Sequence, residues 1–271
     1  MIIYAIISQK GGVGKTTTTV NLGAALAQAG QRVLLLDLDP QGSLTLAVGQ
    51  RARPLSIEHV LREPGAILGA IHPCAGGMQV VTAAATLTGV YMELDKVEAS
   101  AYRLAQALQL VQERYDYVLI DCPPSLGYAT TNALTAAHVA LVPLQCEFLS
   151  LRGLADVQEI AAVIQETTNP GLRLRVLGTM YDKRTIHTAD VLKEARHALP
   201  GLVYETVIPR TIRLAEAPAT GLPILEYAPD SNGTYAYRML AQEILQEDSI
   251  IGTTRPYSSG HAAAPCVPHA A

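Results

Sequence analysis

The stretch QKGGVGKTT, residues 9 to 17, decides the fold of this chain. It follows a short apolar run, residues 2 to 7, and leads into a helical pattern, residues 16 to 29. Closely spaced glycines let backbone N–H groups point inward at an anion, and the N-terminus of the following helix extends that site. The stretch therefore predicts a phosphate-binding loop between a strand and a helix.

The end of this loop matches the P-loop pattern G-x-x-x-x-G-K-[ST], with Gln9 in place of the first glycine. In that pattern Lys15 reaches the β- and γ-phosphates and the Thr16 hydroxyl holds Mg²⁺. Lys10 is a second cation that the pattern does not require. Two ammonium groups about 4 Å apart at an effective dielectric of about 20 would repel by roughly 4 kcal/mol. Lys10 must therefore point away or meet anionic charge from elsewhere. The predicted nucleotide-binding residues of the loop are Lys10, Gly11, Gly12, Val13, Gly14, Lys15, Thr16 and Thr17.

Short apolar runs alternate with helical patterns along the rest of the chain. Such an alternation predicts an α/β fold, with a mostly parallel twisted sheet covered by helices on both faces. The predicted strands are residues 2–7, 33–37, 78–82, 117–121, 139–143, 174–181 and 204–208, and the predicted helices are residues 16–29, 101–114, 151–166 and 188–198. We expect a single domain over residues 1–248. Residues 249–271 are rich in Pro, Ser and Ala without an apolar period, and predict a disordered tail.

Composition narrows the class of protein. With 271 residues, of which 49% are apolar, the chain can bury one large core. No run of about 18 apolar residues occurs, and the start has neither a charged leader nor a cleavage site, so we expect a cytoplasmic protein. The four cysteines form no C-x-x-C pair, which argues against a disulfide framework and against a zinc knuckle.

The charge is unevenly distributed. The net charge is −4, yet residues 173–213 carry eight Lys or Arg and four acids, a balance of +4 that leaves −8 for the remainder. This segment is a candidate anion-binding face, although a solvated helix face gives such runs more often.

Several stretches together indicate a family. KGGVGKTT, residues 10 to 17, resembles the loop of the ParA/MinD ATPases, and so do LLLDLDPQGSLT, residues 34 to 45, and YDYVLIDCPPSLG, residues 115 to 127. Residues 208 to 244, from IPRTIRLAEAP to MLAQEI, are similar to the chromosomal ParA or Soj-type branch. The matches cover nearly all of residues 1–247. The resemblance implies a P-loop ATPase of the deviant Walker A type, with ATP and Mg²⁺ as cofactors.

Acidic residues complete the predicted catalytic centre. Asp121 ends an apolar run as a Walker B aspartate does, and is placed to orient a Mg²⁺-bound water. Cys122 stands where many P-loop ATPases have a glutamate general base. By the resemblance, Asp39 lies beside the attacking water and Asp37 supports the metal shell. Each of the latter two could instead cap a turn before Pro40. The predicted catalytic residues are Lys10, Lys15 and Asp39, and the predicted metal-site residues are Thr16, Asp37 and Asp121.

The resemblance also implies partners. Lys10 would cross an ATP-dependent homodimer to the other subunit's phosphates, and Gly12 would allow the close approach. Pro209 and Arg210 would form the edge of the adenine site. Arg184 and Arg213 would bind DNA phosphates without reading sequence, although surface salt bridges explain such arginines as well.

The sequence alone leaves several functions open. The expected function is chromosome or plasmid partitioning on the nucleoid with a ParB-like partner. A MinD-like membrane-cycling ATPase is the main alternative, but the C-terminal stretch lacks the amphipathic pattern that would bind a membrane. A metal-cluster carrier of the nitrogenase-iron-protein type would need paired cysteines, and an ATP-dependent ligase of the dethiobiotin-synthetase type would need an acceptor pocket.

Overall fold

A computed structural model of the chain describes residues 1–97, 99–146 and 150–252. The strands form one seven-stranded sheet in the order β3-β4-β2-β5-β1-β6-β7. The pairs are parallel except β3 with β4, which is antiparallel. The strands are β1 Ile2–Ile6, β2 Val33–Asp37, β3 Ile71–Pro73, β4 Gln79–Val81, β5 Tyr117–Asp121, β6 Val139–Gln145 and β7 Arg173–Thr179. The predicted mostly parallel α/β sheet is confirmed.

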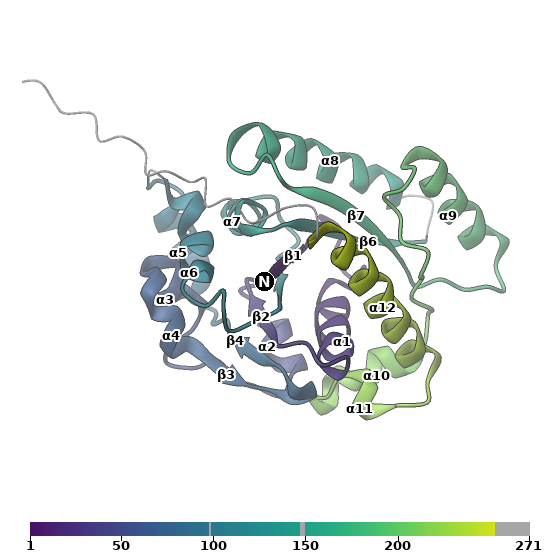
Figure 1. The fold of residues 1–271 in the computed structure, drawn as a ribbon, viewed down its shortest axis with the longest axis horizontal. Helices are drawn as coiled ribbons and strands as arrows, with labels where there is room; N and C mark the ends of the chain where they lie inside the picture. The colour runs from purple at the N-terminus through teal and green to yellow at the C-terminus, as the bar shows by residue number, and fades with distance from the viewer. Residues whose placement is uncertain (98, 147–149, 253–271) are drawn as a thin grey trace, which may run out of the picture.

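Helices cover both faces of this sheet (Figure 1). Helices α1 and α12 pack against each other on one face, and α3, α5, α6 and α7 form a group on the other. The helices are α1 Lys15–Gln28, α2 Ser43–Ala47, α3 Ile57–Arg62, α4 Ile67–Ala70, α5 Leu87–Leu94, α6 Arg103–Gln109, α7 Tyr128–Ala136, α8 Ser150–Thr167, α9 Ile186–Ala198, α10 Ile212–Thr220, α11 Ile224–Tyr227 and α12 Asn232–Gly252. In the described residues, no helix is both long and apolar enough to cross a membrane.

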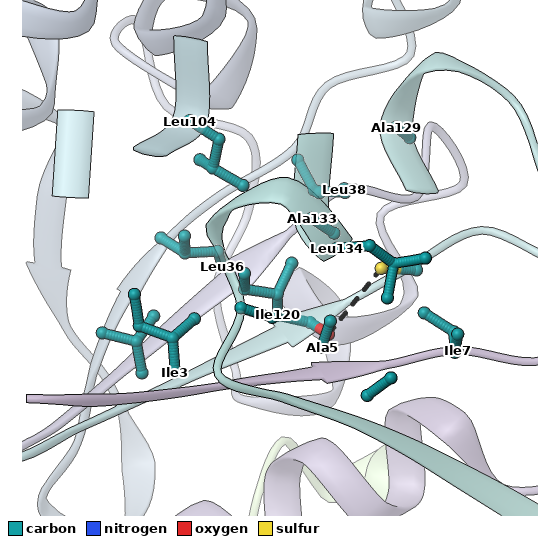
Figure 2. Packing of buried hydrophobic residues seen from close by; sticks show 14 of the residues in the cluster. Ile3, Ala5, Ile7, Leu36, Leu38, Leu104, Ile120, Ala129, Ala133 and Leu134 are labelled. Carbon is teal, nitrogen blue, oxygen red and sulfur yellow. Dashed lines mark hydrogen bonds between the residues drawn. The ribbon is translucent and has the colours of Figure 1, made fainter. Parts of the chain in front are cut away.

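The strands send alternate side chains into two separate cores. In β1, Tyr4 and Ile6 belong to the core under α1 and α12, whereas Ile3 and Ala5 belong to the opposite core. Figure 2 shows this second core, where Ile3, Ala5 and Ile7 lie with Leu36 and Ile120 beneath α7. Because side chains alternate along a strand, burial on both sides requires the nearly continuous apolar strands that the sequence contains.

The structure differs from the predicted elements most clearly in the following segments. The predicted strand 204–208 is irregular, because its backbone contacts with β7 and Tyr181 are limited to isolated bridges at Val203 and Pro209 and a single further bond from Ile208 N to Gly178 O. The short edge strand β3 was not predicted. The predicted helix 101–114 is reduced to α6 and a preceding turn of 3-10 helix, residues 100–102. Helix α12 continues to Gly252, into the predicted tail of residues 249–271, and the rest of that tail lies outside the described residues.

Candidate functional site

Three neighbouring strands end at the same edge of the sheet. Ile6 of β1 pairs with Asp121 of β5, and Asp121 pairs in turn with Asp37 of β2. The loop of residues 9–14 leaves β1 at this edge and enters α1. Ligands of parallel sheets bind beyond the carboxyl ends of the strands. The predicted loop and both predicted acids therefore meet where such a ligand would lie.

The loop has the backbone of an anion-binding turn. Gly12 and Gly14 have φ angles of 76° and 96°, a left-handed conformation that glycine adopts without strain. A Cβ built on either glycine would meet nothing within 4 Å, so the space beside both Cα atoms is open. The Thr179 hydroxyl donates to the Val13 carbonyl at 2.9 Å and fixes the loop to the end of β7. Thr18 N, donating to Gly14 O at 2.8 Å, starts the helix behind it.

Two predicted magnesium ligands are joined. The Thr16 hydroxyl donates to Asp121 Oδ2 at 2.7 Å, and Thr19 one turn further along α1 donates to Asp121 Oδ1 at 3.3 Å. Lys15 is 8% exposed and acts electrostatically on Asp121. A buried carboxylate, a threonine hydroxyl and a lysine thus converge beside the open loop.

Burial strongly affects the charges of this centre. Desolvation, followed by repulsion from Asp37, raises the pKa of Asp121 to about 8. Desolvation likewise raises the pKa of Asp37 to about 6 and lowers the pKa of Lys15, against the attraction of Asp121. A divalent cation reverses this balance, because it favours the ionised form of nearby carboxylates.

Asp37 and Asp39 organise the turn that follows β2. The carboxylate of Asp37 accepts from Thr45 N at 2.8 Å, from the Thr45 hydroxyl at 2.7 Å and from Asp39 N at 3.1 Å. Asp39 Oδ1 accepts from Gln41 N at 2.9 Å. These are the bonds expected of turn-forming aspartates. The turn holds both acids at the edge of the site, and their roles toward metal and water stay predictions.

Lys10 occupies a different position from Lys15. It lies on the exposed side of the loop, and its Nζ donates to Gln145 Oε1, at the end of β6, at 2.9 Å. The two ammonium groups are therefore directed to different surroundings, as the repulsion between them requires.

Cys122 lies inside the core behind the site. Its Sγ contacts Ile120 O at 4.0 Å, and burial raises the pKa of the thiol well above its usual range. Many P-loop ATPases have a glutamate at this position, whereas this chain has a buried, neutral thiol.

The remaining predicted residues surround the end of β7. Pro209 forms an isolated bridge with Tyr181, and Arg210 N donates to Tyr181 O at 3.0 Å. Arg184 is exposed just beyond Tyr181, and Arg213 is exposed in the first turn of α10. The bridge thus joins the two segments that carry the predicted DNA-binding residues.

The residues present fit a nucleoside triphosphate with Mg²⁺. The open glycine loop, Lys15 and the N-terminus of α1 suit phosphates, while Thr16 and Asp121 supply the oxygen ligands that Mg²⁺ prefers. The described residues contain no group of three or more His, Cys, Asp or Glu able to hold a metal ion. Mg²⁺ bound through one or two carboxylates and substrate phosphates needs no such group. When bound, the ion would neutralise charge developing on the phosphates.

Sequence reasoning missed several supporting residues. Thr179 and Gln145 each hold a predicted site residue from a distant part of the chain, and Thr45 holds Asp37 from eight residues further along. Thr19 has a visible signal, its position one turn after Lys15. A cavity of about 380 Å³ also opens beside the loop, between α1, α2 and α10. Its lining includes Thr16, Thr17, Asn21, Leu46, Pro218 and Leu222.

The fold and this site define a P-loop ATPase. A family model described as "AAA domain" matches residues 1–174. The chromosome partitioning protein ParA of Caulobacter vibrioides is 43% identical over 252 residues, 91% of this chain and 94% of the relative. The sporulation initiation inhibitor protein Soj of Bacillus subtilis is 42% identical over 89% of this chain and 97% of its own length. Among solved structures, cobyrinic acid a,c-diamide synthase from Mycobacterium smegmatis, with bound ADP and magnesium, is 39% identical with a TM-score of 0.80, covering 92% of this chain and 96% of that one. The chain belongs to the ParA/Soj family of the ParA/MinD superfamily.

Proposed function

We propose that this protein is an ATP-switched partitioning ATPase. It binds ATP and Mg²⁺, dimerises around the nucleotides, holds DNA non-specifically as the dimer and moves a chromosome or plasmid with a ParB-like partner that stimulates hydrolysis. The location that follows is the nucleoid. The chromosome partitioning protein ParA and the protein Soj are 43% and 42% identical to this chain over most of their length, which supports this assignment.

The proposal rests on the different positions of Lys10 and Lys15. Lys15 is buried beside Asp121 and serves its own subunit's phosphates, whereas Lys10 is exposed and bonds Gln145 at the end of β6. A lysine at this exposed position can reach the phosphates bound by a second subunit that approaches the loop. Gly12 lies next to it, in a conformation with open space where a side chain would be.

Hydrolysis in this scheme is slow. Cys122 replaces the glutamate that would act as general base, and a thiol is a poor substitute for a carboxylate in that role. Asp39, half-buried in the turn beside the site, is then the residue that orients the attacking water. A slow reaction suits a timer that keeps the dimer on DNA until the partner arrives.

DNA binding would use Arg184 and Arg213. Both are exposed, and neither belongs to the nucleotide site. If a single subunit neutralises about two phosphates, log K falls with log salt at a slope near −1.8, and a dimer with about four gives a slope near −3.6. Dimerisation would therefore convert weak contact into useful affinity.

Light scattering with ATP tests the dimer. Lys10→Ala should bind ATP and remain monomeric, because Lys15 still serves the bound nucleotide. A Lys10→Ala protein that dimerises as well as the wild type would refute the role of Lys10 across the interface.

Duplex binding with ADP, ATP and a non-hydrolysable analogue tests the function. Binding only with the triphosphates supports partitioning, and Arg184→Ala or Arg213→Ala should then lose DNA binding while dimerisation persists. ATP-dependent co-sedimentation with liposomes in place of DNA would favour the MinD-like alternative.

A biosynthetic activity is the second candidate, because the cobyrinic acid a,c-diamide synthase structure is 39% identical to this chain. That candidate predicts ATP turnover that depends on a small-molecule acceptor and is indifferent to DNA.

A further inference from the structure

Arg184 is held by a neighbouring carboxylate. Its Nε donates to Asp182 Oδ1 at 2.9 Å and its NH2 donates to Asp182 Oδ2 at 2.7 Å, a two-pronged pair. The backbone N of Arg184 donates to the same Oδ1 at 3.0 Å, which keeps the carboxylate in place. The arginine side chain is nevertheless 83% exposed. A phosphate that binds this arginine must therefore compete with Asp182.

Arg213 is held in the same way from a different element. Its NH1 donates to Glu216 Oε2 at 3.0 Å, one turn further along α10. The Tyr227 hydroxyl donates to that same oxygen at 3.0 Å and fixes the carboxylate next to the arginine. The Arg213 side chain is 55% exposed. Both arginines assigned to DNA thus have an intramolecular acid in place of a phosphate.

The two pairs belong to one region of the surface. The Tyr181–Pro209 bridge joins the segments that lead to Arg184 and to Arg213. Arg210, between them, acts electrostatically on Asp182 and contributes to the lowered pKa of that carboxyl, of which the bond to Arg184 is the main cause. A polyanion approaching this region would meet the two acids together with the arginines.

We propose that Asp182 and Glu216 are built-in competitors for DNA phosphates, which keep the affinity of a single subunit low. This inference rests on the proposed function. Exposed ion pairs are weak, so each would reduce the affinity of its arginine by about 1.5- to 5-fold without preventing binding. In a dimer each factor applies twice, giving about 2- to 25-fold. The acids would thus weaken both states, and a single subunit with two arginines would lose useful affinity before a dimer with four does.

The test measures affinity for a labelled duplex by fluorescence anisotropy, with ATP and with ADP. Asp182→Asn and Glu216→Gln should each bind about 2- to 25-fold more tightly than wild type with ATP, and the double variant more tightly still. Asp182→Asn should give no such gain when Arg184 is also replaced by alanine. In the described part of the chain, the Asp182 carboxylate accepts hydrogen bonds from Arg184 alone. The Asp182→Asn variant should therefore keep its fold, as circular dichroism would verify.

Asp190→Asn is the matched control. Asp190 is exposed on α9 and is bonded to neither arginine in the described part of the chain, and its replacement changes the net charge equally. If the wild type binds DNA but Asp182→Asn and Glu216→Gln gain no more than Asp190→Asn, the inference fails and the proposed function stands. If no variant binds the duplex, both fail. The last measurement uses vesicles rich in phosphatidylglycerol. If Asp182→Asn and Glu216→Gln bind these vesicles more tightly than wild type but bind DNA no more tightly, the arginines contact a membrane and the inference is overturned.

Discussion

Replacing Gly221 by alanine tests how tightly two helix ends are packed. Gly221 ends α10 with φ 71°, and a Cβ there would lie 2.7 Å from Gly49 Cα and 3.0 Å from Gly49 N. Gly49, also at positive φ, follows α2. Two backbones are therefore in direct contact, with no side chain between them that could move aside.

The expected magnitude has two parts. The left-handed conformation costs an alanine about 1–2 kcal/mol. Relieving contacts this short requires a backbone shift, and overpacking of this kind costs about 1–3 kcal/mol more. Gly221→Ala should therefore lower the free energy of unfolding by about 2–5 kcal/mol, measured by urea denaturation followed by circular dichroism.

Gly201→Ala is the matched control for the conformational part. Gly201 has φ 76° and open space at its Cβ position, so only the first cost applies. Gly201→Ala should lose about 1–2 kcal/mol. Equal losses in the two variants would show that the contact between α2 and α10 is not tight, and would refute the reasoning.

Three further predictions concern the site and the core. Thr16→Val removes the hydroxyl that bonds Asp121, and should reduce Mg²⁺-dependent ATP hydrolysis at least tenfold while circular dichroism stays unchanged; full activity would exclude Thr16 as a metal ligand. Gly12→Val places a branched side chain at φ 76° on the outer loop, and should abolish ATP-dependent dimerisation in light scattering, so retained hydrolysis would count against a role at the interface. His138 is neutral in the folded protein, since burial lowers its pKa from 6.5 to about 4, and its Nδ1 accepts from Ile3 N. As pH falls from 6.5 towards 4 the unfolded chain takes up the proton first, so stability should fall by about 3 kcal/mol over that range. His138→Gln should flatten this part of the denaturation profile, and an unchanged profile would assign the pH dependence elsewhere.

The sequence predicted the parts of the fold whose signals are local. The loop of residues 9–17 and the apolar strand before it are recognisable from spacing alone, and Thr16 and Asp121 are indeed in contact. The strand predicted over residues 204–208 has a suitable apolar pattern. Its backbone bonds only intermittently to β7, for example Ile208 N to Gly178 O, and the pattern carries no information about that pairing.

Other features depended on contacts between distant residues. Strand β3 has three residues and contains Pro73, so its composition gives little sign of a strand, and only pairing with β4 establishes it. Thr179 lies far along the chain from Val13, to which it bonds. Nothing in the local sequence of either residue specifies that meeting, because tertiary packing alone brings them together.

The alternating burial of β1 fixes the length of this strand more strictly than its composition. An added or deleted residue would reverse the parity of every later position up to the loop, and would send Tyr4 away from Asp248, to which its hydroxyl donates at 2.9 Å. Isoleucine, valine and leucine can replace one another there at modest cost. The two cores do not tolerate an insertion or deletion of one residue in β1. The number of residues between the start of β1 and the first glycine of the loop is therefore fixed in this architecture.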